Sequence, residues 1–335
     1  MKPRQLVTLI VSLAITAVFL YLALNRVDFD KLAHTFATAN YFFVALAIVV
    51  MFFSYLLRSV RWQRFLAPTK EIPVRRLFPV LIVGFALNNI LPARPGEFAR
   101  GYWLGKREGI SKTLGIATVI VERVMDGLTL IAFLLIALTL FERFGLDLPI
   151  LAEITAGVMS LLFGVALAGM IFLLVRESLA LNMLRWFTRF LPQKISARVD
   201  TMLGSFILGL HSLKSGGHVL AIALISIAIW ILEAGTYWCM LTAFSAPLDA
   251  PVRILASAMT MVMINFGVMI PAAPGGVGPY EAAGIFALSA FPVDETIAAS
   301  VALGTHAIQF LMITGLGLLF IWLEGMKIVT SESDE

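Results

Sequence analysis

Long apolar runs recur along the chain, and the short connections between them carry most of the charge. Runs of about span length occupy residues 6–24, 41–57, 113–141, 154–175, 218–244 and 296–323. A helix that crosses the hydrocarbon core of a bilayer needs about 20 predominantly apolar residues. The pattern therefore predicts an all-α polytopic membrane protein with about six full transmembrane helices. Because the first run is long and no small-residue cleavage site follows it, we expect an uncleaved span rather than a signal peptide.

Two further apolar segments are interrupted. Residues 77–91 form a run that is short for a span, and residues 254–270 lead into a stretch rich in Pro and Gly at 271–279, before residues 280–291 become apolar again. Proline cannot continue a helix without breaking its hydrogen-bond ladder. We expect two broken, re-entrant hairpins here. The alternative is that 254–270 and 280–291 each cross, which changes the span count by two.

The distribution of charge predicts the orientation. Lysine and arginine cluster on both sides of residues 77–91, and such an excess is typical of cytoplasmic loops. The first hairpin is therefore expected to enter from the cytoplasmic side and return to it, and the second to enter from the opposite side. Alternation then predicts cytoplasmic N- and C-termini in a bacterial-type cytoplasmic (inner) membrane.

One transmembrane domain is predicted over residues 1–325, followed by a polar tail at 326–335. A basic, aromatic segment at 176–217 is expected to lie on the membrane interface. It would join two halves, about 41–175 and 218–323.

A shared motif suggests that these halves are repeats. The pattern P-A-x-P-G occurs at 92–96 and at 271–275, and each copy leads to a Pro-x-Glu. Paired Gly/Pro-interrupted segments in two halves are typical of transporters built from inverted repeats, where they mark the binding site. Chance similarity is the alternative, because proline and glycine are common in membrane loops.

Composition excludes several classes of protein. Hydrophobic residues make up 60% of the 335 residues, charged residues only 14%, and the mean hydropathy is +0.93. These values exclude a soluble enzyme and a disordered chain. A single cysteine, Cys239, excludes a disulfide framework and a cysteine-based zinc site. The net charge of +4 fits basic cytoplasmic loops better than nucleic-acid binding.

Ionisable residues inside apolar segments are the candidate functional groups, because each one is costly within a bilayer. Glu122, Arg123 and Asp126 lie within the run 113–141 and, at about 100° per residue, share one face with a net charge of −1. They predict a headgroup contact or a proton relay. A self-neutralising structural network is the alternative.

The two breaks carry a second set of candidates. Glu97 and Glu281 each fall in a first helical turn, where the helix dipole favours a carboxylate. Arg100 shares a face with Glu97, which leaves an ordinary surface ion pair as an alternative. The glycines at 275, 276 and 278 would let the backbone approach a ligand, although simple loop formation would also explain them.

Glu233 and His306 are candidate proton-coupling residues inside later spans. Histidine changes its charge near neutral pH, but a hydrogen bond to a neighbouring helix would also explain His306. No metal site, cofactor motif or catalytic constellation is recognisable in the sequence. The chain is accordingly predicted not to be an enzyme and to need no cofactor.

Three motifs in order carry a family resemblance. Asn89-Ile-Leu-Pro-Ala-Arg-Pro-Gly-Glu-Phe-Ala-Arg100, Val121-Glu-Arg-Val-Met-Asp126 and Pro274-Gly-Gly-Val-Gly-Pro-Tyr-Glu281 resemble the flippase-like transmembrane domain of lysylphosphatidylglycerol synthases over about residues 5–325. The resemblance implies lipid translocation. It does not imply aminoacyl transfer, because no part of this sequence matches the cytosolic domain of those synthases. Other members linked to polyprenyl lipids and envelope glycans widen the expected cargo.

We therefore predict a lipid translocase that binds an anionic or zwitterionic phospholipid, or a polyprenyl-phosphate-linked lipid, between the two hairpins. The predicted headgroup-binding residues are Asn89, Arg94, Glu97, Arg100, Glu122, Arg123, Asp126, Gly275, Gly276, Gly278 and Glu281. The alternatives are a membrane-embedded enzyme or an accessory subunit acting on a lipid-linked envelope precursor. Expected partners are membrane lipid and envelope-lipid-synthesis enzymes, with the oligomeric state left open.

Overall fold

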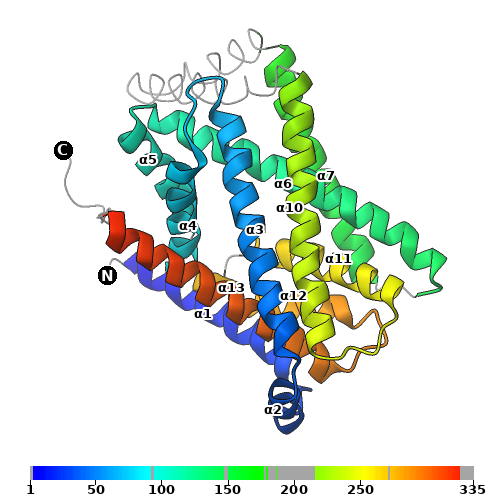
Figure 1. Ribbon diagram of the computed structural model, residues 1–335. Coiled ribbons are helices and arrows are strands. Elements are labelled where there is room, and N and C mark those ends of the chain that lie inside the picture. Colours follow the sequence, from blue (N-terminus) through cyan, green and yellow to red (C-terminus); the bar gives the residue numbers. More distant parts are fainter. Residues whose placement is uncertain are drawn as a thin grey trace.

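The computed structural model describes residues 3–91, 94–146, 150–176, 216–270 and 272–324, together with Leu179 and Trp186. The predicted interfacial segment and polar tail lie almost entirely outside these residues. Every regular element described is helical (Figure 1). The elements are α1 (Pro3–Leu24), α2 (Phe29–Ala37), α3 (Tyr41–Leu66), α4 (Val74–Ile90), α5 (Gly96–Glu108), α6 (Lys112–Arg143), α7 (Ile150–Val175), α10 (Gly216–Ala243), α11 (Ala250–Gly267), η2 (Pro274–Gly276), α12 (Pro279–Leu288) and α13 (Glu295–Glu324).

The predicted all-α polytopic membrane fold is confirmed. Within the described residues, α3, α6, α10, α11 and α13 are long and apolar enough to cross a membrane. A sixth span follows if α1 and α2, which meet at 81°, are taken as one bent pair. The set differs from the predicted one in two places. Helix α11 passes the length and composition test, whereas α7 contains a shorter apolar helix at Glu153–Gly169.

Helix α3 is longer than predicted. The sequence pattern placed its end at residue 57, before a series of arginines, but the helix continues to Leu66. Arg58 and Arg61 are buried within it. The predicted end was wrong because these arginines are neutralised by carboxylates from other helices, so that the helix continues into the protein interior instead of ending at the membrane surface.

The first hairpin consists of α4 and α5. Their close approach depends on two glycines, since a Cβ at Gly84 would lie 3.0 Å from the carbonyl oxygen of Gly96. Asn88 bridges the break by accepting a hydrogen bond from the Gly96 amide at 2.8 Å. At the open end, Lys70 donates to the Glu108 carbonyl at 2.5 Å. The segment thus returns to the side from which it started.

The second hairpin consists of α11, η2 and α12. An added Cβ at Gly267 would lie 2.5 Å from the Cβ of Ala283, so the two helices pack closely. Helix α1 holds the turn between them. The Thr16 hydroxyl donates to the Val277 carbonyl at 3.1 Å and accepts from the Ala273 amide at 3.0 Å. Both interrupted segments therefore fold back on themselves.

Each hairpin packs against a helix from the other half of the chain, and α3 and α10 form a central helix pair. Helices α3 and α10 run antiparallel side by side (Figure 1), as contacts at both ends show: the Asn40 amide donates to the Ala243 carbonyl at 2.9 Å, and Arg61 donates to Ser226 at 3.0 Å. Helix α4 packs against α13, and α11 packs against α6. Each hairpin therefore lies against the long helix that follows the other hairpin.

Candidate functional site

A cavity of about 480 Å³ lies between the two hairpins. Hairpin one contributes Asn88, Asn89, Arg94 and Glu97 to its wall. Hairpin two contributes Asn265, Gly275 and Tyr280 among other residues, and side chains of α3, α6, α7, α10 and α13 also line the cavity. The interrupted segments thus meet at one cavity, which charged, polar and apolar side chains line together.

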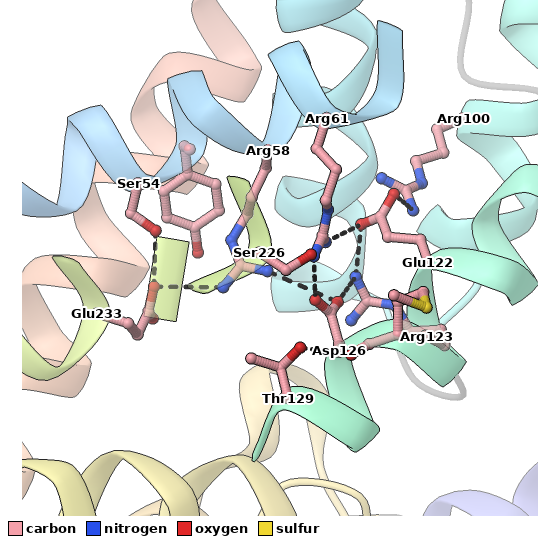
Figure 2. Close-up of polar contacts among 12 residues, drawn as sticks. Ser54, Arg58, Arg61, Arg100, Glu122, Arg123, Asp126, Thr129, Ser226 and Glu233 are labelled. Atoms are coloured by element: carbon pink, nitrogen blue, oxygen red, sulfur yellow. Dashed lines mark hydrogen bonds and ion pairs between the residues drawn. The ribbon is translucent and has the colours of Figure 1, made fainter. Parts of the chain in front are cut away.

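A network of buried ion pairs forms one wall (Figure 2). Arg58 and Arg61 point from α3 towards carboxylates on α6 and α10. Arg61 bonds to Asp126 at 2.6 Å, and Arg58 pairs with Glu233 at 3.3 Å. Ser54 also donates to Glu233, at 2.8 Å. Each of these charged side chains is almost completely removed from solvent.

The network extends away from the cavity through Glu122. This carboxylate is fully buried and pairs with Arg100 at 3.0 Å, Arg123 at 2.8 Å and Arg61 at 3.4 Å. Arg100 is held further by the faces of aromatic rings, with its guanidinium carbon 5.0 Å from the centroid of Trp62. Arginine suits this role because its planar group donates in several directions at once.

The folded ion-pair network has the opposite net charge to the three-residue stripe identified in the sequence. The stripe of Glu122, Arg123 and Asp126 has a charge of −1, but the folded chain adds Arg58, Arg61 and Arg100 to it, together with the carboxylate of Glu233. With every group ionised, four arginines then face three carboxylates, which leaves +1. Arg94 and Glu97, which also line the cavity, cancel each other.

The predicted headgroup residues divide into two groups. The cavity wall contains Asn89, Arg94, Glu97, Arg123, Asp126 and Gly275, as well as the proposed coupling residue Glu233. Arg100 and Glu122 lie behind that wall. Gly276, Gly278, Glu281 and His306 lie outside the set of lining residues.

Glu281 is occupied by local contacts. One carboxylate oxygen accepts from the Gly278 amide at 2.7 Å, and the other lies 2.5 Å from Nδ1 of His306. Nε2 of His306 lies 3.1 Å from the carbonyl oxygen of Gly275. Gly278 has φ of 95° and packs so closely on α1 that an added Cβ would lie 2.8 Å from the Thr16 carbonyl. These contacts order the second break.

Arg94 has an unusual backbone conformation. Its φ is 50°, in the left-handed region that residues other than glycine rarely adopt. Such conformations cost free energy and are concentrated at functional sites. The neighbouring Asn89 is anchored to α13 through a 3.2 Å bond to Thr314. The turn of hairpin one is thus shaped around the cavity.

Sequence reasoning missed several residues of the cavity wall and of the ion-pair network. Arg58 and Arg61 share a helix face three residues apart, which was the local signal for them, but their carboxylate partners lie far away in the sequence. Tyr55, Trp230 and Tyr237 also line the cavity. Aromatic residues in apolar spans are so common that no pattern distinguished these three. Among the described residues, no group of three or more His, Cys, Asp or Glu side chains could hold a metal ion.

Comparison with known proteins gives a consistent result. The family model described as the lysylphosphatidylglycerol synthase TM region matches residues 9–317. A UPF0104 membrane protein of Methanothermobacter thermautotrophicus is 29% identical, covering 82% of this chain and 83% of its own. One from Methanocaldococcus jannaschii is 25% identical over 97% and 96%. The glycosyltransferase AglD of Haloferax volcanii is 26% identical over 92% of this chain but only 53% of its own length.

Proposed function

This chain belongs to the family of the lysylphosphatidylglycerol synthase TM region, and from that premise we propose that it binds a lipid headgroup in the cavity and carries the lipid across the bilayer. The observation that supports this most is the cavity itself. Both broken hairpins line it, and charged side chains cover one side. A polar lipid headgroup needs such a site, because the surrounding hydrocarbon cannot solvate it.

Apolar side chains on the cavity wall suit acyl chains. Ile120, Val124, Leu130, Phe163 and Val268 supply an apolar lining. Two apolar lining residues, Ile120 and Met269, are each 45% exposed. A cavity that presents both charged and exposed apolar side chains favours an amphiphile over a small water-soluble solute. The lipid would keep its tails in the bilayer while its headgroup occupies the cavity.

The proposed transport cycle follows from the packing of each hairpin against a helix of the other half. We propose that residues 41–175 and 218–323 are inverted repeats, which the antiparallel pairing of α3 with α10 supports. In such transporters, one repeat rocks against the other around a fixed site. Movement of α4 on α13 and of α11 on α6 would then expose the headgroup to each leaflet in turn.

The proposed orientation rests on charge. The base of hairpin one carries Lys70, Arg76 and Arg107, and Arg107 pairs with Glu324 at the end of α13. The positive-inside rule favours the cytoplasm for this end. We propose that both chain termini are cytoplasmic, in a bacterial-type inner membrane.

The name of one relative supports an alternative role. The chain spans about half the length of the glycosyltransferase it matches. A role as an accessory subunit or membrane-embedded enzyme, acting on a lipid-linked precursor of the cell envelope, would account for that match. Formation of a covalently altered lipid by the purified chain would favour the enzyme over the translocase.

Leaflet exchange in liposomes tests the proposed function. Purified protein is reconstituted with headgroup-labelled lipids, and the double variant Arg94→Gln/Glu97→Gln is compared with the wild type. Each residue lines the cavity, and a hydrogen bond to a charged group contributes about 1.5–3 kcal/mol. We expect exchange to slow by at least roughly tenfold.

The matched control is Arg26→Gln/Glu295→Gln. It also removes one cation and one anion, from an exposed pair 3.6 Å apart at the surface, and we expect it to leave exchange unchanged. Equal slowing by both double variants, or no exchange of any anionic, zwitterionic or polyprenyl-phosphate lipid by the wild type, would argue against translocation through this cavity.

We also propose that the pair formed by His306 and Glu281 couples transport to protons. Nε2 must donate to the Gly275 carbonyl, so the 2.5 Å contact between Nδ1 and Glu281 needs a second proton on one of its two atoms. Loss of that proton would leave one ring proton for two acceptors, so that either Glu281 or the Gly275 carbonyl would lose its hydrogen bond. His306 also stacks on Tyr280, whose ring lines the cavity, at 4.1 Å between centroids.

His306→Gln tests this coupling, because glutamine keeps a donor but does not titrate. We expect exchange by the variant to continue while its response to an imposed pH gradient is lost. The measurement is leaflet exchange with and without the gradient. A variant that still responds like the wild type would exclude His306 as the coupling group.

A further inference from the structure

The ion-pair network leaves one positive charge uncompensated inside the protein. The cavity wall and the residues directly behind it contain five arginines and four carboxylates. These are Arg58, Arg61, Arg94, Arg100 and Arg123, with Glu97, Glu122, Asp126 and Glu233. Buried charges are normally paired, because an isolated charge in a medium of low polarity is costly. An anion in the cavity would supply the missing partner. One net charge calls for a ligand that carries one negative charge.

Unused hydrogen-bond donors give the same indication. Among the described residues, Arg58 Nε, Arg123 Nε and Trp230 Nε1 are buried donors on cavity-lining residues that have no hydrogen-bond partner. Buried tryptophan usually finds a partner for its N–H group. The one buried side-chain oxygen without such a bond, Oδ2 of Asp126, is 3.0 Å from Arg123 in an ion pair. The buried groups around the wall therefore include more unpaired donors than unpaired acceptors, which favours an anionic ligand beside them.

Arg123 is where such a ligand would bind. Its Nη2 atom makes both contacts to carboxylates, with Glu122 at 2.8 Å and Asp126 at 3.0 Å. Its Nη1 atom takes part in neither of these two contacts. The side chain lines the cavity and is 36% exposed, whereas Arg61 and Arg100 are almost fully enclosed. The Arg123 guanidinium is thus fixed on one side and available on the other.

We infer that the cavity selects lipids whose headgroup is a phosphodiester with one net negative charge, and that Arg123 contacts the phosphate. This inference rests on the proposed function and names its substrate class. A glycerophospholipid with a neutral alcohol and a polyprenyl phosphodiester of a neutral sugar share this chemistry. Phosphatidylethanolamine has no net charge, lysylphosphatidylglycerol is positive because two ammonium groups outweigh one phosphate, and phosphatidic acid approaches two negative charges at neutral pH.

Competitive lipid binding tests the inference without requiring transport. The full chain in neutral detergent is offered these lipids with matched acyl chains, and retained lipid is quantified by native mass spectrometry. We expect phosphatidylglycerol to bind at least about tenfold more tightly than phosphatidylethanolamine, as for one charge-assisted hydrogen bond. A glycosyl phosphoryl polyprenol in a parallel arm identifies which source of phosphodiester binds better. Equal retention of charged and uncharged lipids by the wild type would overturn the inference.

Two variants change the charge in opposite directions. Glu233→Gln keeps acceptor and donor groups near Ser54 and Arg58 but raises the net charge by one, so we expect the preference to shift towards phosphatidic acid. Arg123→Gln lowers the net charge by one and should abolish the preference for phosphatidylglycerol over phosphatidylethanolamine. The control, Glu295→Gln, removes an exposed carboxylate and should leave the preference as in the wild type. If Arg123→Gln fails to fold, Glu233→Gln still decides, and an unchanged preference in that variant would refute charge selection.

The outcome is separable from that of the proposed function. Equal leaflet exchange of phosphatidylglycerol and phosphatidylethanolamine, slowed by Arg94→Gln/Glu97→Gln, would support translocation and overturn the charge rule. Charge-selective binding without leaflet exchange of any lipid would support the charge rule and argue against translocation.

Discussion

Replacing Arg61 by methionine is expected to lower the free energy of unfolding by about 3–5 kcal/mol, because it removes a fully buried arginine that pairs with two buried carboxylates. Arg61 is completely buried and pairs with Asp126 at 2.6 Å and Glu122 at 3.4 Å. Methionine fills similar space but offers neither charge nor donors. Thermal unfolding in detergent measures the effect. Lysine at this position should restore little, because it cannot reach both carboxylates with a planar fork.

The control for this prediction is Arg107→Met. Arg107 pairs with Glu324 at the surface, and exposed ion pairs contribute about 0–1 kcal/mol. A second comparison adds Asp126→Asn to Arg61→Met. Because that change neutralises one of the two carboxylates that Arg61 contacts, the double variant should lose less stability than the sum of the two single variants. An Arg61→Met protein as stable as Arg107→Met would show that the network does not contribute to folding.

Gly96→Ala is expected to disrupt hairpin one. The added Cβ would lie 1.8 Å from the carbonyl oxygen of Gly84 and 2.8 Å from Oδ1 of Asn88. The first neighbour is backbone, so α4 and α5 must separate, and the hydrogen bond that bridges the break is lost with them. Overpacking of this kind costs about 1–3 kcal/mol or more. We expect a lower unfolding temperature and little leaflet exchange, since hairpin one forms part of the cavity wall.

Gly315→Ala is the matched control for that change. Gly315 lies within α13, where an added Cβ would meet nothing within 4 Å. Alanine in a helix interior is favoured over glycine by about 1 kcal/mol, so this variant should be as stable as the wild type or slightly more stable. If both alanine variants unfold at the same temperature, the close packing of α4 on α5 is not a feature of the protein in solution.

The sequence by itself determined the membrane fold and the position of both breaks. In hydrocarbon, every backbone polar group must be bonded internally, so long apolar runs can only become helices. Proline and glycine interrupt two of these runs through their own backbone properties, whatever packs around them. Positive-inside charge indicated that residues 77–91 return to their side of entry, and α4 and α5 do fold back. The length of α3 was not determined by the sequence pattern, because it depends on which charges are neutralised by other helices.

Only the tertiary structure decided how the charged residues combine. Periodicity assigns a residue to a helix face but does not identify the helix opposite it. Asp126 bonds to Arg61 across 65 positions of sequence, and Glu233 bonds to Arg58 across 175. These pairings turned a stripe predicted to be negative into a network with net charge +1. They also separated Glu97, which lines the cavity, from Glu281, which is occupied by Gly278 and His306. The two glutamates share a motif, but the environment of each depends on the helices packed around it, and a local sequence pattern does not specify those neighbours.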